Sequence, residues 1–350
     1  MQLISLGKVA VIALATLASA HPGEHEEHNH EAELAKRHFQ ANARRSLKAC
    51  SNRLESCDLN ARAVARRAAT VQKYSKRPVV RDTDTVLNTS HHSDLAVTPS
   101  TSESVLFSSN FTCVLNPEGE TGPYYVKGEH IRSNLRESQP GVPVVIDGQF
   151  VDVETCEPIA DLWWDVWNCN STGVYSGLVA TGNGNTNDES NLNATFLRGV
   201  QKSDSEGVVQ FETMFPGHYS GRTTHIHMVA HLNVTVLPNN TVVGGTVAHI
   251  GQLFWDQDLI YEVEGTYPYN TNNITITTNA EDRVFSTETE DTTSDPVLEY
   301  VYLGDDLSHG LFAWVTIGVN RSATYSPNYN FIYTSSGGEA IDEVGTDTVN

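Results

Sequence analysis

Residues 207–229 read GVVQFETMFPGHYSGRTTHIHMV, and this stretch decides the fold. Two runs of β-branched and apolar residues, 207–211 and 224–229, flank a segment that contains the turn formers Pro and Gly. Similar runs alternate with Gly, Asn, Asp and Pro from about residue 106 to residue 335, and no long helical period interrupts them. This pattern predicts an all-β fold, a sandwich or a barrel, over residues 106–335.

Two histidines within this stretch lie two positions apart. In a strand, His225 and His227 would point to the same face of the sheet. Their apolar neighbours Ile226 and Met228 indicate a central strand, where buried imidazoles need polar partners. The pair is therefore either a hydrogen-bonded structural pair or two nitrogen ligands of a metal ion.

Tyrosines near the histidine pair bear on which metal is expected. Tyr219 lies in the turn before the strand, and Tyr124 and Tyr125 follow a Gly-Pro turn. Phenolate is a hard, anionic donor that matches Fe³⁺ better than Zn²⁺, because two phenolates offset two of the three charges. A distant carboxylate such as Asp256 would instead complete a zinc site of the hydrolase type.

Three short motifs together resemble one enzyme family, the intradiol ring-cleavage dioxygenases. The resemblance covers about residues 113–258 and is strongest to the fungal secreted branch. The motifs occur in the family's order and at roughly its spacing; they are Gly122-Pro123-Tyr124-Tyr125, Pro216-Gly217-His218-Tyr219 and Arg222-Thr223-Thr224-His225-Ile226-His227. The resemblance implies a β-sandwich oxidoreductase that opens catechol rings with O₂ at a non-haem Fe(III), giving cis,cis-muconate-type diacids.

The same resemblance assigns roles to seven residues. Arg222 would stabilise negative charge on the substrate, and Gln252 would line the active site. Tyr219 would be the tyrosinate that the substrate displaces, while Tyr124 would pack beside the site. The implied iron ligands are Tyr125, Tyr219, His225 and His227.

Two features depart from the bacterial members of that family. The loop from Tyr219 to Arg222 is very short, which should open one wall of the pocket. Trp167-Asn168 stands where many bacterial relatives have Trp-His. The substrate is therefore not identified by the sequence; catechol, hydroxyquinol, protocatechuate and caffeate-like compounds all remain candidates.

Charge is divided unevenly along the 350 residues. The formal net charge is 22 − 43 = −21, with 14 bases and 7 acids in residues 1–81 (+7) and 8 bases and 36 acids in residues 82–350 (−28). So acidic a body should repel nucleic acid and carboxylated catechols, which favours a neutral or weakly charged substrate. The basic segment should pack on that body or on a second subunit, giving a homodimer.

The chain divides into six expected regions. One or two helices are expected over 38–77, with a narrow apolar stripe. Asp58 or Asn60 could cap the second helix, which would run through Val64. The regions are a signal peptide (1–20), a His/Glu-rich leader that ends at a dibasic pair (21–37), a basic helical segment (38–81), a polar linker (82–105), the sandwich (106–335) and a flexible tail (336–350).

Several features predict a secreted, extracellular glycoprotein. Residues 1–20 end in Ala-Ser-Ala, and no later apolar run approaches the length of a membrane span. Five cysteines leave at least one unpaired or intermolecular. Eight glycosylation sequons begin at Asn88, Asn110, Asn170, Asn193, Asn233, Asn239, Asn273 and Asn320. A non-catalytic extracellular binding module is a further alternative to the dioxygenase.

Overall fold

The structure is a computed structural model, and it describes residues 41–42, 45, 59–75, 112–113, 121–180, 182–184, 187–289, 295–334 and 337–346. The expected signal peptide, leader and polar linker lie outside the described residues. No described helix is long and apolar enough to cross a membrane.

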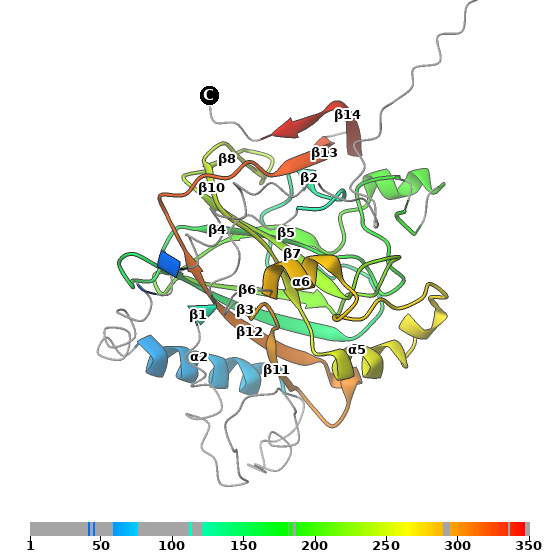
Figure 1. The fold of residues 1–350 in the computed structure, drawn as a ribbon, viewed down its shortest axis with the longest axis horizontal. Coiled ribbons are helices and arrows are strands. Elements are labelled where there is room, and N and C mark those ends of the chain that lie inside the picture. The colour runs from blue at the N-terminus through cyan, green and yellow to red at the C-terminus, as the bar shows by residue number, and fades with distance from the viewer. Residues whose placement is uncertain are drawn as a thin grey trace, which may run out of the picture.

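Two sheets form the body of the molecule (Figure 1). Sheet A has the order β1-β12-β3-β6, with β11 also paired to β12; its strands are β1 (Thr112–Cys113), β3 (Pro143–Asp152), β6 (Val208–Met214), β11 (Glu299–Tyr302) and β12 (Leu311–Val319). Sheet B has the order β10-β7-β4-β5; its strands are β4 (Trp163–Trp167), β5 (Arg198–Lys202), β7 (His225–Leu232) and β10 (Thr246–Phe254). The predicted all-β sandwich is confirmed.

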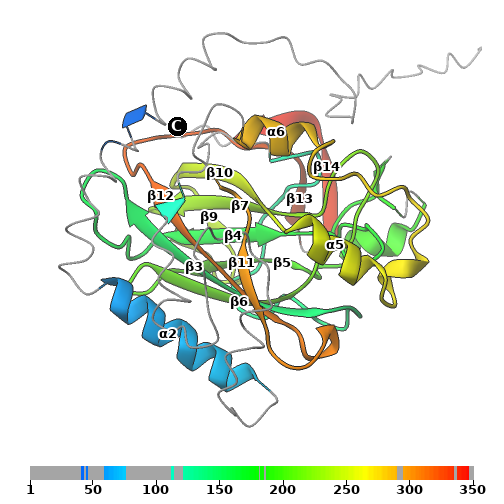
Figure 2. The same cartoon turned by 60° about the horizontal axis from the view of Figure 1, so that its bottom comes forward.

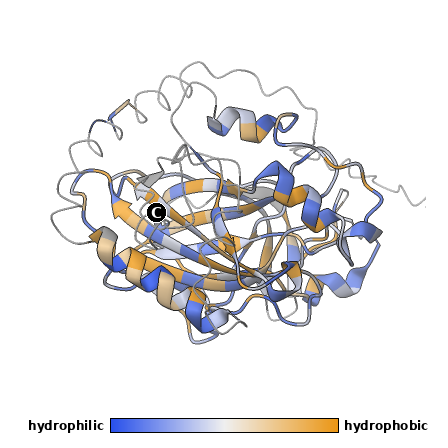
Figure 3. Cartoon of the chain, turned by 90° about the horizontal axis from the view of Figure 1, so that it is seen from below, coloured by the Kyte–Doolittle hydropathy of each residue, from blue (hydrophilic) through white to orange (hydrophobic). Residues whose placement is uncertain are grey.

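The main core lies between the two sheets and takes alternate residues from the long strands. Sheet A contributes Ile146, Phe211 and Ala313, and sheet B contributes Trp164 and Met228. Figure 3 shows the hydrophobic segments concentrated in these strands. Because side chains of a strand alternate between faces, the residues between these core positions point to the outer faces of the sandwich.

Strand β7 is central in sheet B, as its apolar sequence predicted, with antiparallel neighbours β10 and β4. Ile226 and Met228 face the core, so His225 and His227 face outward. Trp167 of β4 and Gln252 of β10 are the cross-strand partners of His227. The sheet register thus gathers polar and aromatic residues on the outer face of sheet B.

The outer face of sheet A is covered by helix α2 (Leu59–Tyr74), which lies along strands β3 and β6 in Figures 1 and 2. Val64, Ala68 and Val71 pack on an apolar cluster that includes Phe312 and Trp314. Of the two partners expected for the basic segment, the structure shows the body of the same chain. The helix runs from Leu59 to Tyr74, within the range 38–77 over which a helix was predicted, because its Ala- and Arg-rich sequence has good helix propensity.

The outer face of sheet B is covered by loops and by a third sheet, β14-β13-β2, formed by β2 (Val126–Lys127), β13 (Asn328–Thr334) and β14 (Gly337–Thr346). The expected flexible tail was wrong over residues 337–346. A Cβ at Gly338 would meet the Gly177 carbonyl, so the Gly-Gly pair lets this strand approach the loop closely.

The remaining elements are short and lie at the edges. They are the hairpin β8 (Thr235–Val236) and β9 (Val242–Val243), the helices α5 (Gln257–Glu264) and α6 (Arg283–Thr289), and the 3₁₀ turns η1 (Glu189–Asn193), η2 (Tyr269–Thr271) and η3 (Leu307–His309). Among the cysteines, Cys156 is disulfide-bonded and Cys169 is a buried free thiol. The expectation of an unpaired cysteine is therefore confirmed.

Candidate metal centre

Three side-chain atoms converge on the outer face of sheet B. The Nε2 atoms of His225 and His227 are 3.0 Å apart, and the Tyr219 hydroxyl lies 3.2 Å from Nε2 of His225. All three side chains are buried. The short turn that precedes β7, closed by the bridge between Tyr219 and Arg222, brings the phenol back over the strand. The predicted cluster of Tyr219, His225 and His227 is present.

The hydrogen bonds of His225 fix which of its nitrogens faces the cluster. Nδ1 lies 2.6 Å from the carbonyl oxygen of Thr223 and donates to it, because a carbonyl can only accept. Burial, and secondarily the charge of Arg222, lowers the pKa of His225 well below its usual range. The imidazole is therefore neutral, with the lone pair of Nε2 directed into the cluster.

A second tyrosine reaches the cluster, and it is Tyr175. Its ring lies 5.6 Å from the ring of Tyr219 and 5.9 Å from that of His227, measured between centroids. The hydroxyl is buried and has no hydrogen bond of ordinary geometry within the described residues. Burial, and then the nearby Tyr219, raises the pKa of Tyr175 well above its usual value. Tyr175 was not among the residues predicted from the sequence.

Tyr125, the predicted first tyrosinate, is not brought to the cluster. Its hydroxyl donates to Asp165 over 3.2 Å, and its ring stacks on Trp167 with centroids 4.7 Å apart. Trp167 also stacks on His227 at 4.9 Å, with the planes only 2° apart. The Tyr125 hydroxyl thus bonds to Asp165 and is not among the atoms that converge at the two histidines, and this geometry corrects the prediction.

The Gly-Pro turn that suggested Tyr125 still borders the site. A Cβ at Gly122 would approach the His227 ring to 3.0 Å, so the turn packs directly on this imidazole. Tyr124, which was expected to pack, contacts Tyr219 edge-on and lies 4.9 Å from the ring of Tyr175. The motif therefore builds a wall of the site.

Arg222 and Gln252 lie together beside the cluster, as predicted. Nη2 of Arg222 donates to Oε1 of Gln252 over 2.6 Å, and Nε donates to Asp282 over 2.9 Å. Although burial lowers it, the charges of Tyr219 and Asp282 raise the pKa of Arg222, so the guanidinium stays charged. Nη1 takes part in no hydrogen bond with the described part of the chain and is available to a ligand.

The donor set fits a hard, highly charged cation. Adjacent donors on one ion with bonds of about 2.1 Å lie about 3 Å apart, which matches the separation of the two Nε2 atoms. Burial raises the pKa of both Tyr175 and Tyr219, so the phenols ionise here only if a cation compensates for the charge. The described residues contain no group of three His, Cys, Asp or Glu side chains placed for a metal, so Asp256 does not complete a zinc site with the histidines.

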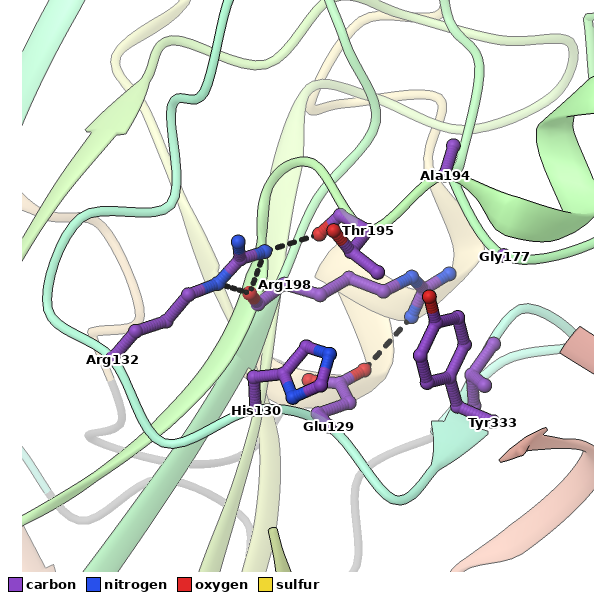
Figure 4. Close-up of a pocket in the computed structure, with 9 residues that line it drawn as sticks. Glu129, His130, Arg132, Gly177, Ala194, Thr195, Arg198 and Tyr333 are labelled. Atoms are coloured by element: carbon purple, nitrogen blue, oxygen red, sulfur yellow. Dashed lines mark hydrogen bonds and ion pairs between the residues drawn. The ribbon is translucent and has the colours of Figure 1, made fainter. Parts of the chain in front are cut away.

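A separate small pocket, with a volume of about 10 Å³, is lined in part by Gly177, which belongs to the loop that carries Tyr175. Figure 4 shows Arg198 crossing it to pair with Glu129, while Arg132 bonds the backbone of Thr195 and Arg198. Arg198 also donates to the backbone of Tyr124 and Ser176, residues that adjoin the cluster. The arginine therefore ties the two loops of the site together.

Comparison with known proteins agrees with this site. A family described as Dioxygenase matches residues 120–237. The structure of an intradiol ring-cleavage dioxygenase from Tetranychus urticae is similar, with 32% sequence identity and a TM-score of 0.50; the match covers 61% of this chain and 98% of that one. No curated protein sequence matches the chain.

Two bacterial structures resemble the chain more remotely. A hydroxyquinol 1,2-dioxygenase from Pseudomonas putida is 18% identical (TM-score 0.38, covering 59% of this chain and 67% of that one). A catechol 1,2-dioxygenase from Pseudomonas arvilla is 18% identical (TM-score 0.37, covering 59% and 62%). These two are too remote to inform the substrate.

The match to the Tetranychus enzyme spans nearly all of that protein, and the family match over residues 120–237 includes the histidine strand. The chain therefore belongs to the intradiol ring-cleavage dioxygenase family.

Proposed function

We propose that this protein is a secreted enzyme that cleaves catechol rings between the two hydroxyl-bearing carbons, using O₂ and a non-haem ferric iron. The proposed ligands are Tyr175, Tyr219, His225 and His227. The observation that carries the proposal is the convergence of the Tyr219 hydroxyl and the two histidine Nε2 atoms to within 3.2 Å. Two imidazoles and two phenols supply two neutral nitrogens and two anionic oxygens, a set that suits Fe³⁺.

The bound iron would supply Lewis acidity and a template that holds both catechol oxygens. The chain's own groups then handle protons and charge. Tyr219, whose pKa burial raises, would accept a proton from a catechol hydroxyl at its phenolate oxygen. Arg222 directs Nη1 to negative charge that develops on the ring, an electrostatic role of the kind often worth several kcal/mol. Gln252 keeps Nη2 of that guanidinium in place.

Export from the cell is part of the proposal, and three observations support it. Residues 1–20 have the pattern of a signal peptide. Cys156 is disulfide-bonded, and disulfides persist in oxidising compartments. The asparagines of four sequons, Asn193, Asn233, Asn239 and Asn273, are exposed and accessible to N-linked glycans. The resemblance to the fungal secreted branch is in line with these features.

The preferred substrate is proposed to be a neutral or weakly charged catechol. Residues 82–350 carry a formal charge of −28, which disfavours approach of a carboxylated ring. Oxygen uptake measured with catechol and with protocatechuate at low and at high salt tests this directly. We expect the higher kcat/KM for catechol, with a ratio that narrows as salt screens the surface charge. A higher kcat/KM for protocatechuate would contradict the proposed preference.

Metal analysis tests the proposed cofactor. The purified protein should hold one iron per chain and absorb visible light through charge transfer from tyrosinate to iron. His225→Ala should lose most of its iron, and Tyr219→Phe should keep iron but lose most of its turnover. One zinc per chain, or a colourless protein with a full complement of iron, would contradict the ligand assignment.

A further inference from the structure

Asp282 is a buried carboxylate beside the proposed site, outside the residues 120–237 that match the family. Its side chain is 0% exposed. Oδ2 accepts from Nε of Arg222 over 2.9 Å and from the backbone N–H of Thr223 over 2.7 Å. One oxygen atom thus holds both the guanidinium and the peptide that follows it.

Hydrogen bonds through Thr223 connect Asp282 to His225, a proposed metal ligand. The backbone N–H of Thr223 donates to Asp282, while its carbonyl oxygen accepts from Nδ1 of His225 over 2.6 Å. Fixing this residue at its N–H also fixes the carbonyl that orients the imidazole. Hydrogen bonds of this kind set the tautomer and direction of a ligating histidine.

The other oxygen anchors Asp282 itself. Oδ1 accepts from the backbone N–H of Phe285 over 2.8 Å, so Asp282 caps the first turn of α6. The same segment is tied down by Asn279, which accepts from the Thr223 hydroxyl and donates to the carbonyl of Trp255. The carboxylate is therefore held in place by hydrogen bonds to α6, and the segment before it is bonded to Thr223 and Trp255.

The charge of Asp282 has a second consequence for Arg222. A nearly buried guanidinium requires a counter-charge, and Asp282 provides it at Nε rather than at the terminal nitrogens. Gln252 takes Nη2, which leaves Nη1 as the donor for the substrate. A carboxylate on the terminal nitrogens would compete with an anionic substrate for them.

We propose that Asp282 is the positioning residue of this site, which aims Arg222 at the substrate and, through Thr223, His225 at the metal. The proposal rests on the proposed dioxygenase function. It assigns a role outside the motifs that the sequence made conspicuous, because Asp282 lies 60 residues after Arg222 in the chain.

The test is a double-mutant cycle on the iron-loaded, full-length protein with Asp282→Asn, Arg222→Met and the double variant. Asparagine is as good a helix cap as aspartate, so Asp282→Asn can keep the cap with its one oxygen. It then removes the charge and places an NH₂ donor where Oδ2 accepted from Arg222 and Thr223. We expect kcat for catechol to fall about 10- to 100-fold in Asp282→Asn, as for other residues that orient metal ligands. KM and visible absorption should change little. The double variant should be slower than Arg222→Met by less than the full loss caused by Asp282→Asn alone, because only the route through Thr223 and His225 then remains.

Asp306→Asn is the matched control, since Asp306 caps η3 through the backbone N–H of Ser308 and touches no residue of the site. It should leave kcat unchanged. If Asp282→Asn is insoluble, Asp282→Glu replaces it, because the carboxylate is kept but displaced by one methylene; kcat should still fall at least about tenfold.

The outcomes separate the two proposals. If wild type consumes O₂ with catechol while Asp282→Asn, or its Glu replacement, keeps a normal kcat, Asp282 has no positioning role. Additive losses in the cycle would equally overturn action through Arg222. A wild-type protein that contains iron but cleaves no catechol would instead overturn the proposed function, and this inference with it.

Discussion

The two outer faces of the sandwich each bury a carboxylate against arginine, and they use it differently. On sheet A, Asp147 receives two bonds from Arg66, one from Arg67 and one from Gln210. On sheet B, Asp282 receives one bond from Arg222 and two from backbone N–H groups, while Arg222 keeps Nη1 unbonded by the described residues. Both carboxylates accept hydrogen bonds on both oxygens, so the difference lies in the nitrogen that Arg222 keeps beside the proposed site.

This difference separates a structural contact from a reactive one. The Asp147 cluster joins α2 to the sheet, and although burial opposes it, Arg66 and Arg67 hold the pKa of Asp147 below its usual value. Both oxygens of Asp147 accept from side chains of α2 and the sheet. The Arg222 cluster keeps Nη1 without a bond from the described residues, as the proposed function requires. Changes on sheet B should therefore affect turnover, and changes on sheet A should affect stability.

The largest expected effect is on sheet B, where Tyr175→Phe removes a proposed metal ligand. We expect turnover of catechol to fall by about 1,000-fold, equivalent to about 4 kcal/mol of barrier. The visible absorption should weaken and shift, because one tyrosinate is lost. Oxygen uptake and absorption spectra of the iron-loaded variant measure both effects.

Tyr125→Phe is the matched control for that variant. It removes a hydroxyl of the same kind that bonds to Asp165, from a ring that stacks on Trp167. We expect the visible absorption to be kept and turnover to stay within about tenfold of wild type, since the loss is that of an outer hydrogen bond. If Tyr125→Phe bleaches the protein and Tyr175→Phe does not, the ligand set proposed here is wrong.

On sheet A, Asp147→Ala should lower stability and leave turnover alone. Arg67, whose side chain is 3% exposed, would be left buried without its counter-charge. Breaking a buried pair in this way costs about 3–5 kcal/mol. Chemical unfolding measures the loss, and the kcat of the folded fraction should stay within twofold of wild type. A normal unfolding midpoint with reduced kcat would reverse the assignment of the two faces.

A smaller effect is expected from His249, which is fully buried in β10 and has a pKa that burial lowers to about 3. The unfolded chain binds a proton at this histidine near pH 6.5, whereas the folded protein does not until about pH 3. Stability should therefore be lost as pH falls from about 6.5, by about 1.4 kcal/mol per pH unit.

His249→Leu removes that titration. The slope of the unfolding free energy against pH should be lower by about one proton between pH 6 and pH 4 than in wild type. Urea unfolding at several pH values provides the slopes. Equal slopes in the two proteins would show that His249 is protonated in the folded state.

The smallest effect is expected at the end of α2, where the Tyr74 hydroxyl donates to Glu212 over 2.9 Å. Tyr74→Phe should cost about 0.5–1.5 kcal/mol, the usual net contribution of one hydrogen bond. A loss as large as that of Asp147→Ala would mean that the end of the helix, rather than the arginine cluster, dominates its attachment.

Residues with a strong local pattern were predictable from the sequence. The alternation in residues 224–229 gave the central strand, the shared face of His225 and His227, and the sandwich class. Tyr219 and Arg222 are close to that strand in the chain, so a short turn is enough to place them. The position of a side chain was predictable where only a few residues separate it from a regular strand.

Residues placed by long loops were not predictable in this way. Tyr175 lies in an irregular loop 50 residues before His225, between Gly173 and Gly177, which both adopt positive φ. These closely spaced glycines were a signal of a sharply turned loop that presents a side chain. The Gly-Pro-Tyr-Tyr motif was more conspicuous, yet its second tyrosine is directed to Asp165 by the sheet register of β4. No local sequence pattern around Asp282 indicated a role in the site.

The most direct test of the central claim is the product that the iron-loaded protein forms from catechol and O₂. The account predicts one O₂ consumed per catechol and a colourless product with the ultraviolet absorbance of cis,cis-muconate, abolished in His225→Ala. No oxygen uptake, or a yellow product from cleavage outside the two hydroxyl-bearing carbons, would contradict it.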